Sequence, residues 1–124
     1  MACSICSPQE VCQNFEYTAP SGGYVAWTMY LINDTVCVNK ATTAVGEEAV
    51  MYYWIPKVIV DCLTITAGNI ANYDEGSKVY FDSTNNRVTH VSAAWQLCGI
   101  VTVRPTADDT TVEIQLDGML GIVA

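Results

Sequence analysis

Short runs of hydrophobic residues, separated by small clusters of turn-forming residues, recur along most of this chain. The runs are rich in β-branched and aromatic residues and have the lengths typical of β-strands. The predicted strands are residues 23–32, 35–39, 48–55, 57–65, 78–82, 87–91, 93–103 and 110–116. Strands at this regular spacing predict an all-β fold, a compact sandwich or barrel of short antiparallel strands.

Two polar connections predict hairpins. Asn33-Asp34 separates the runs 23–32 and 35–39, and the sequence STNN at 83–86 separates 78–82 from 87–91. Asparagine is favoured in such turns because it tolerates left-handed backbone angles. We therefore expect residues 78–82 and 87–91 to pair antiparallel, with Asn85-Asn86 exposed at the tip.

Helix signals are few and lie mainly at the N-terminus. Ser7, Pro8 and Glu10 match a helix cap, a first-turn proline and a capping-box acid. A second helical turn, or only a loop, is expected within residues 66–76. The composition changes near Gly22-Gly23, which predicts an N-terminal arm over residues 1–20 and a single β domain over residues 21–124.

The six cysteines could form a metal site, a redox centre or a disulfide clip, or they could have a structural role. Cys3, Cys6 and Cys12 lie within ten positions. Tetrahedral zinc sites are usually built from two close pairs of Cys or His ligands, and this chain has one close pair. A redox dithiol favours a βαβ context, which the pattern lacks. We therefore expect a structural cluster without metal or cofactor, and we expect Cys62 and Cys98, in apolar runs, to pack in the core.

Other candidate chemistry is sparse. His90 is the only histidine and lies in a strand-like run, and Asp74-Glu75 and Asp108-Asp109 lie in predicted turns. Glycines such as Gly76 have no phosphate-loop pattern around them. We expect no catalytic, cofactor-binding or metal-binding residues, and hence no enzyme.

Charge narrows the classes of partner. The 124 residues carry a net charge of −8, and the five basic residues are scattered singly. This disfavours binding to nucleic acid or to an anionic membrane surface. The longest apolar stretches fall short of the roughly 18 residues of a membrane span. The first basic residue is Lys40, so no signal peptide is recognised and folding in a cytoplasm, with reduced thiols, is expected.

One stretch carries a family resemblance. The sequence EGSKVYFDSTNNRVT at 75–89 resembles a signature of tailed-phage capsid decoration proteins, also called cement proteins. Further segments resemble the same family in the same order: TAPSGGYV at 18–25, TAVGEEAVMYYWIPKV at 43–58, LCGIVTV at 97–103 and TTVEIQL at 110–116. The likeness covers residues 18–116. Ser77 replaces the family's usual aspartate, and MYYWIPK lacks its usual glycine.

The resemblance implies a structural virion protein. Such a protein is made in the host cytoplasm, forms a homotrimer, binds the outer surface of the phage head and stabilises the major capsid protein lattice. The apolar ends of the chain are the candidate contacts with capsid or neighbouring subunits, with packing inside the chain as the alternative. These residues are Cys3, Cys6, Val11, Phe15, Met119, Leu120 and Ile122. The rival interpretation is a secreted or surface β-sandwich adhesion module stabilised by disulfides.

Overall fold

The computed structural model describes residues 12–92 and 95–118, and this part of the chain is all-β, as the sequence predicts. Within these ranges, eight strands form one antiparallel sheet, accompanied by one short 3-10 helix. The elements are β1 (Gln13–Thr18), β2 (Met29–Ile32), β3 (Thr35–Asn39), β4 (Glu48–Asp61), η2 (Ile70–Tyr73), β5 (Lys78–Asp82), β6 (Arg87–Thr89), β7 (Gln96–Val103) and β8 (Thr111–Asp117).

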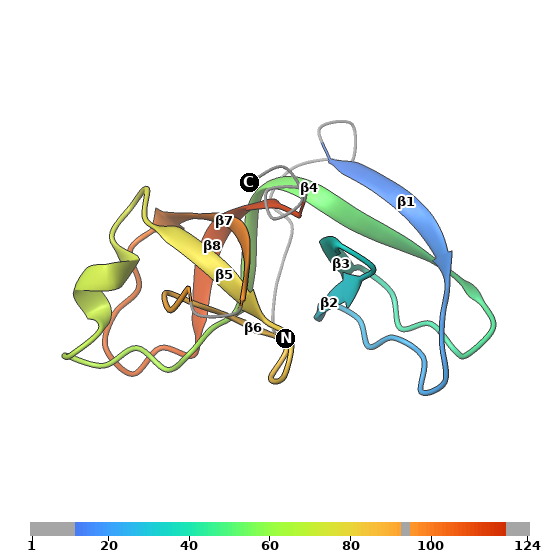
Figure 1. The fold of residues 1–124 in the computed structure, drawn as a ribbon, viewed down its shortest axis with the longest axis horizontal. Helices are drawn as coiled ribbons and strands as arrows, with labels where there is room; N and C mark the ends of the chain where they lie inside the picture. The colour runs from blue at the N-terminus through green and yellow to red at the C-terminus, as the bar shows by residue number, and fades with distance from the viewer. Residues whose placement is uncertain (1–11, 93–94, 119–124) are drawn as a thin grey trace.

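The long strand β4 runs through two lobes of the molecule (Figure 1). Its first half pairs with β1 and β3 across overlapping residues, so these two strands lie on opposite edges of β4. Its second half pairs with β8. The order β1, β4, β3, β2 makes one lobe, with β1 outermost.

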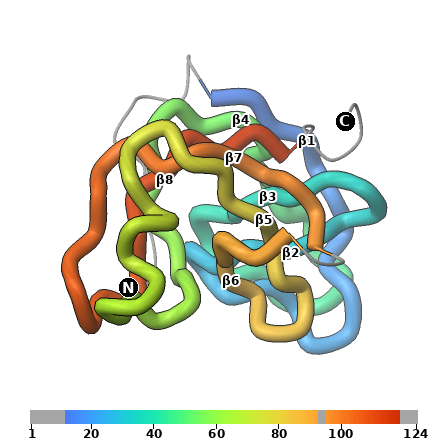
Figure 2. Tube along the Cα trace, turned by 60° about the vertical axis from the view of Figure 1, so that its left-hand side comes forward, coloured from blue at the N-terminus to red at the C-terminus, as the bar shows by residue number. Residues whose placement is uncertain are grey.

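The second lobe is a nearly closed barrel (Figure 2). The sheet curls from β4 through its neighbours β8, β7 and β5 to β6. Leu63, just after β4, donates its backbone N–H to the carbonyl oxygen of Val88 at 2.9 Å, and Cys62 forms a parallel bridge with the same residue. These contacts bring β6 back to the end of β4. The main hydrophobic cluster, which includes Ile55, Tyr73, Phe81, Cys98, Val101, Ile114 and Leu116, fills the interior.

A smaller hydrophobic cluster lies in the first lobe. Ala19, Tyr24, Ile32, Cys37, Ala49 and Met51 are buried in it. Strand β3 serves both clusters, because Val36 and Val38 face the main one and Cys37 faces the smaller one. Burial on both faces explains why the sequence of β3 shows no polar alternation.

Pro56 does not separate two strands. Residues 48–55 and 57–65 were predicted as separate strands, yet Glu48–Asp61 is continuous. The pairing with β8 shifts register between Ile55 and Val58, so Pro56 occupies an irregularity where its missing N–H is tolerated. The shift also explains how Ile55 and Val58, three positions apart, are both fully buried.

The run 23–32 was predicted as one strand, but only its last four residues form β2. Gly22, Gly23 and Trp27 have positive φ angles of 93°, 66° and 61°, which bend the backbone away from an extended path. Tyr24 retains only an isolated bridge to Thr43.

Part of the expected N-terminal arm is strand β1. Residues 13–18 pair with β4, and Cys12 is buried in the main cluster with 7% of its surface exposed. Strand pairing therefore begins before the expected boundary at residue 20. The predicted helix start over residues 7–10 lies outside the described residues.

Both predicted hairpins are confirmed. Ile32 pairs with Thr35, and Asn33 adopts a φ of 54° in the turn. Asp82 pairs with Arg87, and Asn86 has a φ of 51°. Asn85 is exposed at the tip, as expected, while Asn86 is half-buried.

Candidate docking surfaces

Of the seven residues predicted to contact capsid or neighbouring subunits, only Phe15 belongs to the described part of the chain. Its ring stacks on Tyr53 with centroids 5.9 Å apart and planes 27° apart, and it packs against the smaller cluster. The hydroxyl of Tyr53 donates to Oε1 of Gln13 at 3.1 Å, which ties the start of β1 to β4. The remaining six, Cys3, Cys6, Val11, Met119, Leu120 and Ile122, lie outside the described residues.

The outer edge of β1 is a first candidate surface, which we call the β1 edge (Gln13–Thr18). Within the described ranges, β1 pairs with β4 alone. Five of its six residues are exposed, the exception being the half-buried Phe15. Its sequence contains one charge, on Glu16, and neither lysine nor proline. Such an edge presents backbone donors and acceptors to another strand.

A shallow groove on the outside of the barrel is a second candidate. Ile59 of β4 and Val103 of β7 are 37% and 53% exposed, and both pair with Glu113 of the intervening β8. Thr102 donates its hydroxyl to Oε2 of Glu113 at 2.8 Å, which holds the carboxylate between the two apolar residues. The groove measures about 220 Å³ and is lined by Ile59, Val103, Arg104, Pro105, Asp109, Thr111, Val112 and Glu113.

A third candidate lies on the first lobe. The ammonium group of Lys40 is 5.6 Å from the ring centroid of Tyr52, a cation–π contact. The hollow beside it measures about 260 Å³ and is lined by Lys40, Ala41, Thr43, Glu48, Ala49, Val50 and Tyr52. Both hollows are smaller than the roughly 300–1,000 Å³ pockets that enclose drug-sized ligands. Their size fits side chains of a docked protein better than a whole small molecule.

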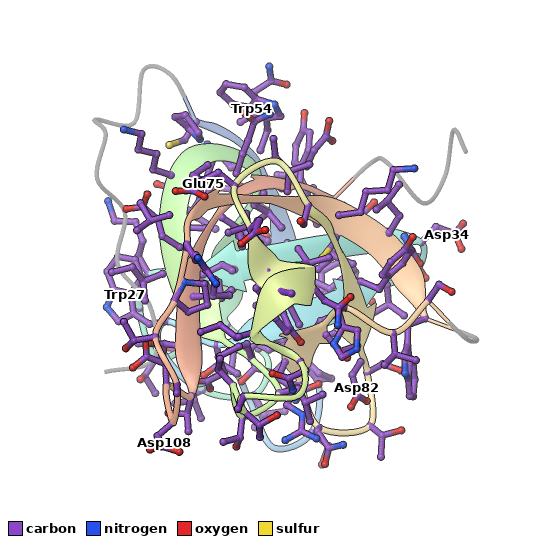
Figure 3. All side chains as sticks on the ribbon, turned by 90° about the vertical axis from the view of Figure 1, so that its left-hand side faces the viewer. Trp27, Asp34, Trp54, Glu75, Asp82 and Asp108 are labelled. Carbon is purple, nitrogen blue, oxygen red and sulfur yellow. The ribbon has the colours of Figure 1, made fainter. Side chains whose placement is uncertain are left out.

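Acidic side chains are spread over both the strands and the connections of the sheet. Figure 3 shows Asp34, Glu75 and Asp108 projecting at widely separated points around one view. Arg104 pairs with Asp74 through Nε and Oδ1 at 3.1 Å, but both side chains are about half exposed, so the pair adds little stability. The net charge of −8 therefore acts mainly as a diffuse field around the molecule.

Three buried cysteines are free thiols: Cys37, Cys62 and Cys98. Burial raises the pKa of Cys37 and of Cys62 to about 12, and it also raises the pKa of Cys98. The expectation that Cys62 and Cys98 pack in the core is confirmed. Three disulfides would require all six cysteines, so the free thiols speak against the fully disulfide-stabilised adhesion module.

Neither a metal cluster nor a membrane helix is found where the structure describes the chain. No group of three or more His, Cys, Asp or Glu residues in residues 12–92 and 95–118 is placed to hold a metal ion. None of the helical segments in these ranges has the length and apolarity of a membrane-spanning helix.

His90 has a structural contact that the sequence does not reveal. Its backbone N–H donates to the hydroxyl oxygen of Tyr73 at 3.0 Å, and its Nδ1 lies 3.0 Å from the same oxygen. Tyr73 is fully buried, and burial raises the pKa of its phenol although the hydrogen bond from His90 opposes the shift. The pair fastens η2 to the end of β6. Nothing in the sequence near Tyr73 predicts this long-range partner.

Comparison with known proteins decides the family. The family model of the phage cement protein matches residues 10–116. The chain belongs to the phage cement protein family. The match to this cement protein contains β1 in full and extends through Leu116 of β8. Neither the curated proteins nor the solved structures gave a match.

Proposed function

We propose that this cement protein binds the outer surface of a phage head and stabilises the major capsid protein lattice, without catalysing a reaction. The observation that carries the proposal is membership of the cement family over residues 10–116, which include nearly all of the sheet. The exposed apolar residues support it, because they lie on both lobes. One molecule therefore has surfaces for two neighbouring capsid subunits.

A homotrimer is the proposed assembly. Three tryptophans, Trp27, Trp54 and Trp95, are only half-buried in the single chain. Aromatic side chains of this kind are enriched at protein interfaces. A trimer presents each capsid contact three times, so weak individual contacts combine into high avidity on a repeating lattice.

The outer surface of the virion is the proposed location, after synthesis in the host cytoplasm. The charge of −8 favours this side of the shell, because packaged DNA is also negatively charged and would repel the protein from the inner side. The free thiols Cys37, Cys62 and Cys98 are compatible with folding in a reducing compartment.

The test uses heads assembled without this protein. Adding the purified full-length chain should give saturable binding, threefold density on the outer surface by electron microscopy, and a higher temperature of DNA release. Protein added after saturation should remain unbound, which provides the internal control for specific sites. Absence of binding, or binding that leaves the release temperature unchanged, would contradict the proposal.

A further inference from the structure

We propose that the groove on the outside of the barrel binds a basic side chain, lysine or arginine, of a capsid subunit. We call it the Glu113 groove and define it by Ile59, Val103 and Glu113. The inference rests on the proposed function and names the chemistry of one contact with the capsid. It combines two exposed aliphatic walls with a carboxylate that is held between them.

The walls of the Glu113 groove suit the stem of a long side chain. Ile59 and Val103 pair with Glu113 from opposite sides, so the three residues form one row across β4, β8 and β7. Neighbouring strands are about 4.8 Å apart, which separates the two walls by roughly 10 Å. Both aliphatic side chains are exposed. The methylene groups of lysine and arginine pack along such apolar surface while the charged head reaches polar groups.

The carboxylate of Glu113 is oriented before any partner arrives. Thr102 donates its hydroxyl to Oε2 of Glu113 at 2.8 Å. A carboxylate can accept about four hydrogen bonds, so most of its capacity remains for an incoming donor. A side chain that is already ordered loses little conformational entropy on binding. A charged donor gains more at this carboxylate than a neutral one, because charge-assisted hydrogen bonds are stronger.

The charges that line the groove favour a cation. The charged lining residues are Arg104, Asp109 and Glu113, one positive and two negative. Nε of Arg104 lies 3.1 Å from Oδ1 of Asp74, so a further carboxylate already balances the positive charge. Glu113 belongs to neither of the salt bridges found within residues 12–92 and 95–118. A lysine or arginine from a partner therefore complements the charge of the groove.

Other occupants fit the groove less well. An apolar side chain would cover the Glu113 carboxylate without donating a hydrogen bond, and burying an unpaired charge is costly. A second copy of this chain is disfavoured at this groove, because each copy carries a net charge of −8 and its five basic residues are scattered singly. A metal ion alone is disfavoured because the described ranges contain no group of three or more ligating side chains.

Replacing Glu113 tests the role of the charge. Glu113→Gln keeps the size of the side chain and an oxygen that can accept from Thr102, but it removes the negative charge. On heads assembled without this protein, we expect the apparent dissociation constant to rise about tenfold. The difference from the wild type should shrink as the salt concentration rises from about 0.05 M to about 0.5 M, because salt screens exposed charges.

Asp34→Asn is the matched control, since it removes the same charge from an exposed residue. Asp34 lies in the turn between β2 and β3, and Figure 3 shows it widely separated from Asp108, the neighbour of the groove residue Asp109. Its backbone carbonyl, rather than its carboxylate, accepts a hydrogen bond from Gln96. The control should shift the dissociation constant by less than about twofold. Equal shifts for Asp34→Asn and Glu113→Gln would assign the effect to the overall charge and overturn the inference.

The aliphatic walls are tested by one substitution made at two positions. Val103→Thr replaces a methyl group by a hydroxyl in the groove, and Val91→Thr makes the same change at another exposed valine, after β6. We expect binding to heads to weaken about threefold for Val103→Thr at every salt concentration and to stay unchanged for Val91→Thr. Equal binding of the two variants would show that no side chain packs against the walls, which overturns the inference. Circular dichroism and urea unfolding verify that each variant is folded.

Photo-crosslinking identifies the occupant. Gln115 lies on the same face of β8 as Glu113, because alternate residues of a strand share a face. A photoreactive phenylalanine analogue at position 115 therefore lies beside the groove and leaves its three defining residues in place. Irradiation on heads should crosslink it to the major capsid protein, close to an exposed lysine or arginine. A crosslink to a second copy of this chain would overturn the inference.

A charge exchange then tests the pairing itself. Replacing the identified lysine or arginine of the capsid protein by glutamate should weaken binding of the wild-type chain. The same heads should bind Glu113→Lys more tightly than the wild type, because the exchange restores opposite charges. Failure of the exchanged charges to restore binding would overturn the inference.

The outcomes separate this inference from the proposed function. If the wild type binds heads and raises the temperature of DNA release while Glu113→Gln binds as tightly, the inference is wrong and the cement function stands. If the wild type does not bind heads, the proposed function fails and the inference fails with it.

Discussion

Gly118 and Val36 approach so closely that a side-chain carbon on Gly118 would overlap the carbonyl oxygen of Val36. The contact lies where β8 ends against β3, since both strands lie along the same edge of β4. Position 118 therefore has room for glycine alone unless the backbone of β3 moves.

Gly118→Ala should lower the free energy of unfolding by about 1–3 kcal/mol, because the new methyl group forces β3 and β8 apart. The measurement is equilibrium unfolding in urea. Gly68→Ala is the control, since a methyl group there would meet only the hydroxyl of Thr66 at 3.7 Å. Equal stability of the two variants would contradict the account of this junction.

The turn between β5 and β6 should make stability depend on pH. Oδ1 of Asp82 accepts from the backbone N–H groups of Thr84 and Asn85 at 2.9 and 3.2 Å, and Oδ2 accepts from Nδ2 of Asn85 at 2.8 Å. Burial alone would raise the pKa of Asp82, but these hydrogen bonds and the charge of Arg87 outweigh it and lower the pKa.

A carboxyl group whose pKa is lower in the folded state stabilises the fold at pH values above its pKa in the unfolded state. This stabilisation is lost as the pH falls through the pKa of the folded state. Asp82→Asn should therefore be less stable than the wild type near neutral pH. The difference should shrink below about pH 4. Urea unfolding at several pH values measures it, and a difference that stays constant with pH would show that the charge of Asp82 is not responsible.

The buried thiols should resist alkylation in the folded protein. With a pKa of about 12, Cys37 and Cys62 are thiolates in only about one molecule in 10⁴ at pH 8. Iodoacetamide should label Cys37, Cys62 and Cys98 slowly in the native state. It should label them rapidly in denaturant without any reductant.

Mass spectrometry of the labelled peptides gives the result for each thiol separately. Failure of these three cysteines to react in denaturant, with recovery after reduction, would reveal disulfides. That outcome would contradict the account of Cys37, Cys62 and Cys98 as free thiols in the core.

Tyr73→Phe should destabilise the protein by about 1–2 kcal/mol, because it removes the hydrogen-bond partner of the His90 backbone N–H. Thermal or urea unfolding measures the change. Tyr80→Phe, at a half-buried position of β5, is the control and should cost less. Equal costs for the two variants would mean that the contact with His90 adds no stability.

The sequence predicts the fold class and both hairpins because their determinants are local. Asn33 and Asn86 occupy left-handed turn positions, and asparagine there is itself the signal. The continuity of β4 across Pro56 is different. That continuity depends on pairing with β8, which is distant in sequence. The pairing shifts register opposite the proline and so tolerates it.

Strand β1 was missed because its signal is weak. Its alternation over Asn14, Phe15 and Glu16 is strand-like, but most of its side chains are exposed and no strong apolar run results. The break before β2 depends on the positive φ of Trp27, which nothing in a tryptophan's chemistry predicts. The β1 edge likewise requires knowledge of which strand ends up outermost.

Strand β4 has a mechanical consequence for the two lobes that it joins. Its fourteen residues belong to both lobes, so pulling the lobes apart draws on one continuous backbone rather than on a flexible joint. Tension along β4 slides it against β1, β3 and β8, and the hydrogen bonds of those ladders resist together instead of opening one by one. If the two lobes hold neighbouring capsid subunits, as proposed above, a molecule built this way transmits tension between them with little extension.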